Sequence, residues 1–149
     1  MDLSKVSDQI TKVLVTEEQI NEKVAELAAE LDQRYAEKNV LLVGVLKGAV
    51  MFMADLSRAI QIPVQMDWMA VSSYGSGTVS SGVVRILKDL DADVLGRHVL
   101  IVEDIIDSGL TLSWLISNLK ARGAASVEIV ALLRKPDAAK VQVDVAWVG

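Results

Sequence analysis

The pattern of apolar positions along the chain alternates between two periodicities. Unbroken apolar runs are typical of parallel strands covered on both faces, whereas apolar residues three and four positions apart predict helices with one buried face. Because the two kinds of segment take turns, we expect an α/β fold: a Rossmann-like parallel sheet flanked by helices. The predicted strands are 40–45, 64–71, 83–87, 99–102 and 126–133, and the predicted helices are 16–38, 49–60 and one that ends before Gly123.

The ends of the chain and one internal segment break this alternation. We expect a short strand at 13–15, and a last strand over 141–147, whose alternating apolar and polar residues are typical of a strand near a sheet edge. Residues 73–82 are rich in glycine and serine, which predicts a flexible loop or lid. With no linker or repeat, residues 1–149 fit a single domain.

The first two predicted helices differ in how they meet solvent. Thr16 and Gln19 match a capping box at the start of the first helix, which carries a single apolar stripe. Residues 49–60 are apolar on all sides, so we expect this helix in the interior. The methionines expected in the core are Met51, Met53, Met66 and Met69.

The composition narrows the choice of partners. The net charge is −5 and lysines and arginines do not cluster, so we expect no nucleic-acid partner. The absence of cysteine excludes disulfides, thiolate catalysis and cysteine-based metal sites. No apolar stretch reaches the roughly 18 residues of a membrane span, and no signal peptide precedes the first helix. We therefore expect a cytoplasmic protein, without membrane contact, that binds small molecules and metal ions.

Residues 99–112 carry the strongest functional signal. An apolar strand is followed by two acids, and Asp107, Ser108 and Gly109 predict a turn into a helix. Ligands of open α/β sheets bind at this end of the strands, where the free N–H groups of a helix start attract anions. Gly109 lets the backbone approach closely, while Ser108 and Thr111 add hydroxyl donors. The pattern predicts a phosphate site.

The three acids of this segment have alternative interpretations. Glu103 and Asp104 suit either sugar hydroxyls or a hydrated Mg²⁺, although an arbitrary acidic pair is usually solvated. Asp107 is either a helix cap or a group for acid/base chemistry beside a phosphate. The sequence by itself does not separate these roles.

Four other residues of the sequence are candidates for a functional role. Lys47 and Lys135 follow predicted strands, and we expect both at the carboxyl edge of the sheet. His98 fits a structural role, and Trp114 lies off the apolar stripe of its helix and hints at a subunit contact.

Neither a G-x-G-x-x-G fingerprint after a strand nor a P-loop motif is present, which disfavours a dinucleotide dehydrogenase and a P-loop NTPase.

The segment from Val102 to Thr111 resembles the phosphoribosyl-diphosphate (PRPP) binding motif of type I phosphoribosyltransferases. Leu46-Lys-Gly48 resembles that family's pyrophosphate loop, Ser73-Tyr74 its mobile catalytic loop, and Leu132-Leu-Arg-Lys135 its purine-recognition segment. From about Thr16 onward, the chain is similar to the bacterial hypoxanthine-guanine phosphoribosyltransferases. The resemblance therefore implies the type I phosphoribosyltransferase fold.

The resemblance also implies a role for each matched residue. Glu103 and Asp104 would bind the ribose hydroxyls with Mg²⁺ nearby, and Lys47, Gly48, Ser73 and Tyr74 would meet the pyrophosphate. Asp107 would face purine N7 and take part in proton transfer at that nitrogen. Lys135 would donate a hydrogen bond to the exocyclic oxygen of the base. The 5′-phosphate would be cradled by Asp107, Ser108, Gly109, Leu110 and Thr111.

The implied activity is purine salvage. The enzyme would transfer the 5-phosphoribosyl group from PRPP to a 6-oxopurine, hypoxanthine or guanine, giving IMP or GMP plus pyrophosphate. The family also implies a homodimer or homotetramer, and often a cis peptide bond in the pyrophosphate loop.

The chain departs from the family at its end. Members normally continue beyond the position of Gly149 into a segment that covers the base, so we expect a truncated form with better PRPP binding than purine binding. The alternatives are a PRPP-binding regulator, a xanthine phosphoribosyltransferase, a weakly active truncated form and a scaffold subunit.

Overall fold

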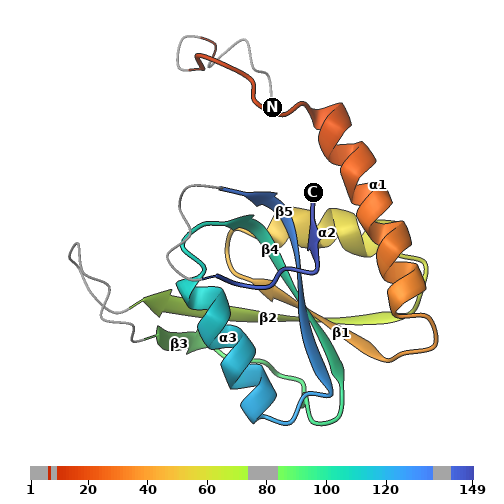
Figure 1. The fold of residues 1–149 in the computed structure, drawn as a ribbon, viewed down its shortest axis with the longest axis vertical. Helices are drawn as coiled ribbons and strands as arrows, with labels where there is room; N and C mark the ends of the chain where they lie inside the picture. The colour runs from red at the N-terminus through yellow and green to blue at the C-terminus, as the bar shows by residue number, and fades with distance from the viewer. Residues whose placement is uncertain (1–6, 8–9, 74–83, 136–141) are drawn as a thin grey trace.

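A six-stranded sheet flanked by helices forms the centre of the molecule (Figure 1). The computed structural model describes residues 7, 10–73, 84–135 and 142–149. The strand order is β3-β2-β1-β4-β5-β6, and the predicted α/β class is confirmed. The elements are α1 (Glu17–Arg34), β1 (Val40–Val45), α2 (Val50–Ala59), β2 (Val64–Ser73), β3 (Val84–Lys88), β4 (His98–Ile106), α3 (Leu110–Ala121), β5 (Ser126–Arg134) and β6 (Trp147–Val148).

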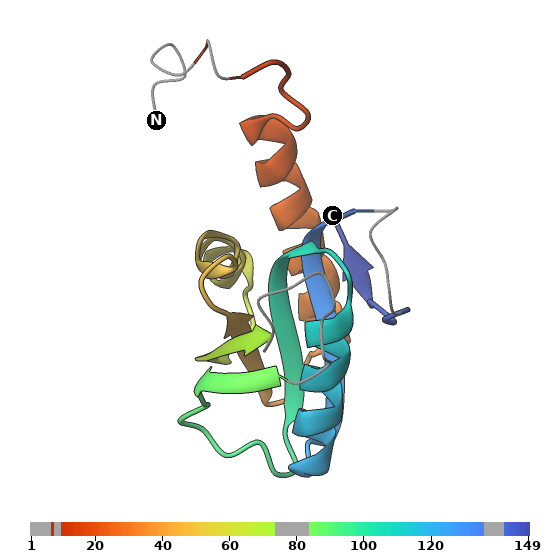
Figure 2. The ribbon, with the colours of Figure 1, turned by 90° about the vertical axis from the view of Figure 1, so that its left-hand side faces the viewer.

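Helices cover both faces of the sheet, and α2 and α3 lie on opposite sides of it in Figure 2. Successive residues of a strand point to opposite faces, so each central strand contributes to two cores. Leu42 and Leu100 pack with α1 and α2, whereas Leu41 and Val99 pack with α3. All four side chains are fully buried. The central strands β1 and β4 are therefore enclosed, as their unbroken apolar runs predict.

One strand runs against the expected parallel arrangement. β3 pairs antiparallel with β2, whereas the pairs β2–β1, β1–β4, β4–β5 and β5–β6 are parallel. The stretch between Ser73 and Val84 is shorter than the crossover that a parallel connection needs, so the chain reverses direction. The flexible loop expected at 73–82 lies outside the described residues, except that Ser73 ends β2.

Both terminal strand predictions need correction. Residues 13–15 form no strand, and Leu14 is 80% exposed. Of the strand expected at 141–147, only Trp147 of the described part pairs with β5, and Val148 extends it. Val143 is nevertheless buried, and its carbonyl accepts a hydrogen bond from the Arg134 side chain. The segment therefore buries alternate apolar residues without joining the sheet.

The bounds of α2 match the prediction closely, whereas α1 ends at Arg34 and not at residue 38 as predicted, and Glu37 beyond it has a positive φ of 60°. Thr16 and Gln19 form the predicted capping box of α1, and α2 covers the sheet through Met53, which is fully buried. Met51 is 73% exposed and Met66 is 49% exposed, so the expectation that these two lie in the core is wrong. The apolar composition of α2 therefore does not make it an interior helix. No helix in the described part of the chain is both long and apolar enough to span a membrane.

Candidate functional site

The carboxyl end of β4 and the start of α3 form the centre of the candidate site. β4 continues to Ile106, so Glu103 and Asp104 lie inside the strand rather than in the loop that follows it. The N-cap of α3 is Gly109, in the left-handed region at φ 78°, and it makes no side-chain capping bond. Asp107 is therefore not the cap of α3, and the positive φ accounts for a glycine at this position.

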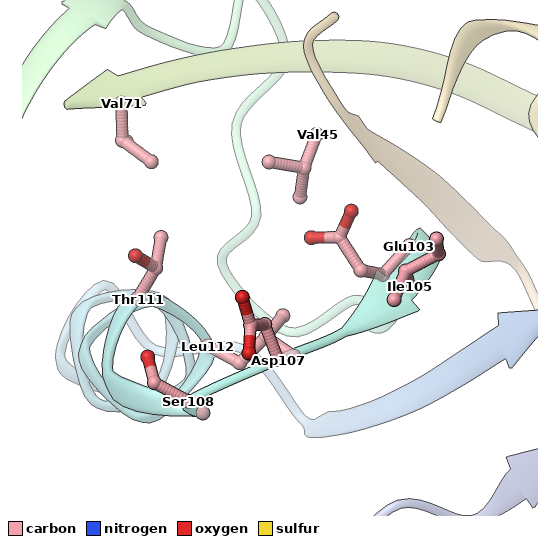
Figure 3. Close-up of a pocket in the computed structure, with 9 residues that line it drawn as sticks. Val45, Val71, Glu103, Ile105, Asp107, Ser108, Thr111 and Leu112 are labelled. Atoms are coloured by element: carbon pink, nitrogen blue, oxygen red, sulfur yellow. The ribbon is translucent and has the colours of Figure 1, made fainter. Parts of the chain in front are cut away.

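A pocket of about 240 Å³ opens at this junction (Figure 3). In the close-up, the carboxylates of Glu103 and Asp107 and the hydroxyls of Ser108 and Thr111 surround a common space. The structure thus brings together five of the residues expected to bind PRPP, while Asp104 and Leu110 lie outside the lining. The lining consists of Val45, Val71, Glu103, Ile105, Asp107, Ser108, Gly109, Thr111 and Leu112.

Four apolar residues of the lining were not anticipated as site residues. Val45 and Val71 come from the carboxyl ends of β1 and β2, and Ile105 and Leu112 come from β4 and α3. Their signal in the sequence was only their position at the ends of predicted strands or at a helix start. Apolar walls beside a few convergent polar groups are typical of small-molecule sites.

Glu103 is a half-buried acid of the pocket lining. Burial raises the pKa of its carboxyl to about 8, and a hydrogen bond with the neighbouring Asp104 side chain and the charge of that group act in the same direction. The N–H of Asp104 donates to Glu103 Oε1 at 3.2 Å, which opposes this rise in pKa only in part. At neutral pH these surroundings favour a proton on Glu103.

The donor set of this acidic pair fits a magnesium ion. Glu103, which lines the pocket, and Asp104, the next residue of β4, carry carboxyl oxygens, the ligands that Mg²⁺ prefers. Among the described residues, no cluster of three or more histidine, cysteine, aspartate or glutamate side chains forms a metal cage.

The Lys47-Gly48 segment follows β1, the strand that neighbours β4 in the sheet. The peptide bond between Leu46 and Lys47 is cis, and the Leu46 N–H donates to the carbonyl of Met69 at 2.8 Å. Lys47 is exposed, and Gly48 lies directly against the Asp104 carboxylate. The loop at the end of β1 thus contacts the acidic pair.

Lys135 occupies the corresponding place at the end of β5. Its N–H donates to the carbonyl of Ile106 at 3.0 Å, which holds the residue beside the end of β4. Its Nζ lies 3.7 Å from Asp107 Oδ2, and both side chains are more than half exposed. Lys47 and Lys135 therefore reach the carboxyl edge of the sheet, as expected, but from strands on opposite sides of β4.

The remaining candidates are only partly placed. Ser73 is the last residue of β2, on the same edge of the sheet, and Tyr74 lies outside the described residues. His98 Nδ1 lies 2.7 Å from Ser126 Oγ at the opposite end of β4, consistent with a structural role. Trp114 packs partly buried against the α3-side core.

The family model described as "Phosphoribosyl transferase domain" matches residues 13–149. The chain is 57% identical over 146 residues to a hypoxanthine-guanine phosphoribosyltransferase of Mycobacterium avium, covering 94% of this chain and 72% of that one. It is 54% identical over 140 residues to the enzyme of that name from Bacillus subtilis, covering 94% and 78%.

The fold of the chain is similar to that of solved structures from the same group of enzymes. A hypoxanthine phosphoribosyltransferase from Staphylococcus aureus superposes with a TM-score of 0.95 at 41% identity, covering all of this chain and 81% of that one. The resemblance drawn from four short motifs therefore extends over the whole sheet and its helices. On the family match, the sequence identities and the shared fold, this chain belongs to the phosphoribosyltransferase family.

Proposed function

We propose that the chain transfers the 5-phosphoribosyl group of PRPP to hypoxanthine or guanine, releasing pyrophosphate and forming IMP or GMP. The observation that carries this proposal is the pocket in which the half-buried Glu103 carboxyl, the Asp107 carboxylate and the hydroxyls at the start of α3 face one another. The names of the relatives support the choice of a 6-oxopurine as acceptor.

The start of α3 is suited to hold the 5′-phosphate. The residues Asp107 to Thr111 present backbone N–H groups and two hydroxyls, and no described lysine or arginine lines this pocket. A helix N-terminus binds an anion through its free N–H groups and its dipole. Because Gly109 has a positive φ and no Cβ, the phosphate can approach this backbone closely.

The acidic pair is suited to orient the ribose. Glu103 and Asp104 would accept hydrogen bonds from the two ribose hydroxyls and supply oxygens to Mg²⁺. When bound, Mg²⁺ neutralises charge on the pyrophosphate leaving group. Lys47, the backbone of Gly48, Ser73 and Tyr74 would hold that pyrophosphate at the ends of β1 and β2.

Asp107 is suited to accept a proton from the purine, and Lys135 is suited to donate a hydrogen bond to it. The C1–O bond to pyrophosphate breaks while the C1–N bond to the purine forms, and the proton displaced from the base passes to the Asp107 carboxylate. Lys135 would donate to the exocyclic oxygen of the base. The 3.7 Å between Lys135 Nζ and Asp107 Oδ2 puts both groups within reach of one base.

The proposal is tested by an activity panel. The protein is incubated with PRPP and Mg²⁺ together with hypoxanthine, guanine, xanthine or uracil, and nucleotide formation is followed by chromatography. We expect product with hypoxanthine or guanine and none with uracil. If xanthine were the only acceptor, the proposed specificity for hypoxanthine or guanine would be wrong. If calorimetry showed PRPP binding but no base gave product, a PRPP-binding regulator would be favoured.

We further propose that the chain assembles as a homodimer or homotetramer. Val50 and Met51 on α2 and Met66 on β2 are apolar and exposed, which is the kind of surface that subunit contacts cover. Light scattering coupled to gel filtration tests this proposal, and a mass equal to one chain at micromolar concentration would contradict it.

A further inference from the structure

The backbone of Gly48 packs against the carboxylate of Asp104, and this contact leaves no room for a side chain. A Cβ on Gly48 would lie 2.6 and 2.8 Å from the two carboxylate oxygens and 2.9 Å from Cγ. Contacts this short do not occur between real atoms of these types, so either the carboxylate or the loop would have to move. The contact therefore joins the loop after β1 to the acidic pair on β4.

Neither partner of this contact is free to move away. Asp104 Oδ1 accepts a hydrogen bond from the N–H of Ile105 at 2.8 Å, which fixes the carboxylate against its own strand. On the loop side, the N–H of Leu46 is bonded to Met69, and Ala49 is fully buried with its N–H bonded to the carbonyl of Val45. Gly48 thus lies between two anchored residues.

The conformation of Gly48 does not itself require glycine. The positive φ values among the described glycines belong to Gly96, Gly109 and Gly123, so an alanine at position 48 would meet no strain in the left-handed region. The requirement at this position is steric, and it comes from Asp104.

We infer that Gly48 is a positioning residue: by lacking a side chain, it lets the Asp104 carboxylate keep the orientation in which it meets the ribose and Mg²⁺ of PRPP. The inference rests on the proposed function, in which Gly48 would otherwise only contact pyrophosphate through its backbone. Gly48 then acts on PRPP binding through Asp104.

A double-mutant cycle without substrate tests the contact. Gly48→Ala is introduced into the parent, into Asp104→Asn and into Asp104→Ala, and Tm is measured without ligand. Because asparagine keeps the atoms that the new Cβ would meet, Gly48→Ala is expected to lower the Tm by about 3 °C or more in the parent and in Asp104→Asn. In Asp104→Ala the space is open, so the same change is expected to have little effect. Equal losses in all three backgrounds would overturn the contact.

The same variants in calorimetry with PRPP and Mg²⁺ test the effect on binding. Gly48→Ala is expected to weaken PRPP binding about tenfold in the parent and to raise the Mg²⁺ concentration needed for half-saturation. In Asp104→Ala it is expected to add no further loss. An equal loss in the Asp104→Ala background would show that Gly48 acts directly on pyrophosphate and would overturn the inference. Failure of the parent itself to bind PRPP would overturn the proposed function and the binding part of this inference, and the Tm cycle would still decide the contact.

Discussion

At the scale of single residues, the acids of the site differ in their surroundings more than in their chemistry. Glu103 is half-buried in the pocket lining, Asp104 is held against Gly48, and Asp107 is largely exposed beside Lys135. Three carboxylates within one short segment can therefore take three separate roles. The segment itself was recognisable from the sequence, but the environment of each acid depends on residues from β1 and β5.

Replacement of Asp107 tests the proposed proton acceptor. Asp107→Asn removes the charge that accepts the purine proton and keeps the backbone N–H groups that would face the phosphate. We expect kcat to fall by about a hundredfold or more, the range of general acid–base contributions, with PRPP affinity changed much less. Steady-state kinetics and calorimetry on the same preparation provide the two readouts. A loss confined to PRPP affinity would assign Asp107 to phosphate binding alone.

The raised pKa of Glu103 predicts a pH dependence of stability. With a pKa of about 8 in the folded protein against 4.5 when solvated, the folded state holds an extra proton between these two values. Stability therefore falls as pH rises across that window. Glu103→Gln, which cannot ionise, should be more stable than the parent by roughly 2 kcal/mol at pH 8.5, less than the full shift implies because water reaches the site.

Thermal denaturation from pH 5 to pH 8.5 measures this difference. The advantage of Glu103→Gln should shrink steadily toward pH 5, where Glu103 is protonated in the folded parent. Asp55→Asn, which removes a partly exposed carboxylate of α2 that pairs with Arg58 outside the pocket, is the control for the loss of a charge. A constant difference between Glu103→Gln and the parent at all pH values would contradict the assignment of the proton to Glu103.

At the scale of elements, the sequence predicted a helix end correctly where the residues that form the cap are close together in the chain. The Thr16 side chain accepts a hydrogen bond from the N–H of Gln19, and the Gln19 side chain accepts one from the N–H of Thr16. Both partners are three residues apart, so the sequence was sufficient. The left-handed Gly123 after α3 is a second such case.

Thr16→Ala should destabilise the protein by about 1 kcal/mol, because the start of α1 loses its side-chain cap. Thr16→Ser keeps the hydroxyl and should stay within about 0.5 kcal/mol of the parent. Urea denaturation followed by circular dichroism measures both variants. Equal stability of Thr16→Ala and the parent would mean that the first turn of α1 contributes nothing to the fold.

At the scale of the whole molecule, the sheet is most enclosed at its centre. β1 and β4 have a strand on each side and helices on both faces, whereas β3 and β6 lie at the edges of the sheet. Leu41, Leu42, Leu100 and Ile101 have no exposed surface. The candidate site therefore lies at the carboxyl ends of β1 and β4, the most enclosed strands of the sheet.

Hydrogen exchange should follow this gradient. We expect the amides of β1 and β4 to exchange slowest, because they open only with the whole sheet, and those of β6 to exchange fastest. Exchange followed by mass spectrometry at peptide resolution measures the order. Protection of β6 equal to that of β1 would contradict the arrangement described above.

The sequence by itself determined the alternation of strands and helices, the phosphate-type junction and the family resemblance. These features depend on residues close together in the chain, whose spacing decides which face is buried and which N–H groups are free. Only the tertiary structure decided that Trp147 and Val148 form the last strand and that Met51 and Met66 are exposed. It also decided that Gly48 packs against Asp104. Each of these outcomes depends on contacts between residues far apart in the chain, which no local pattern records.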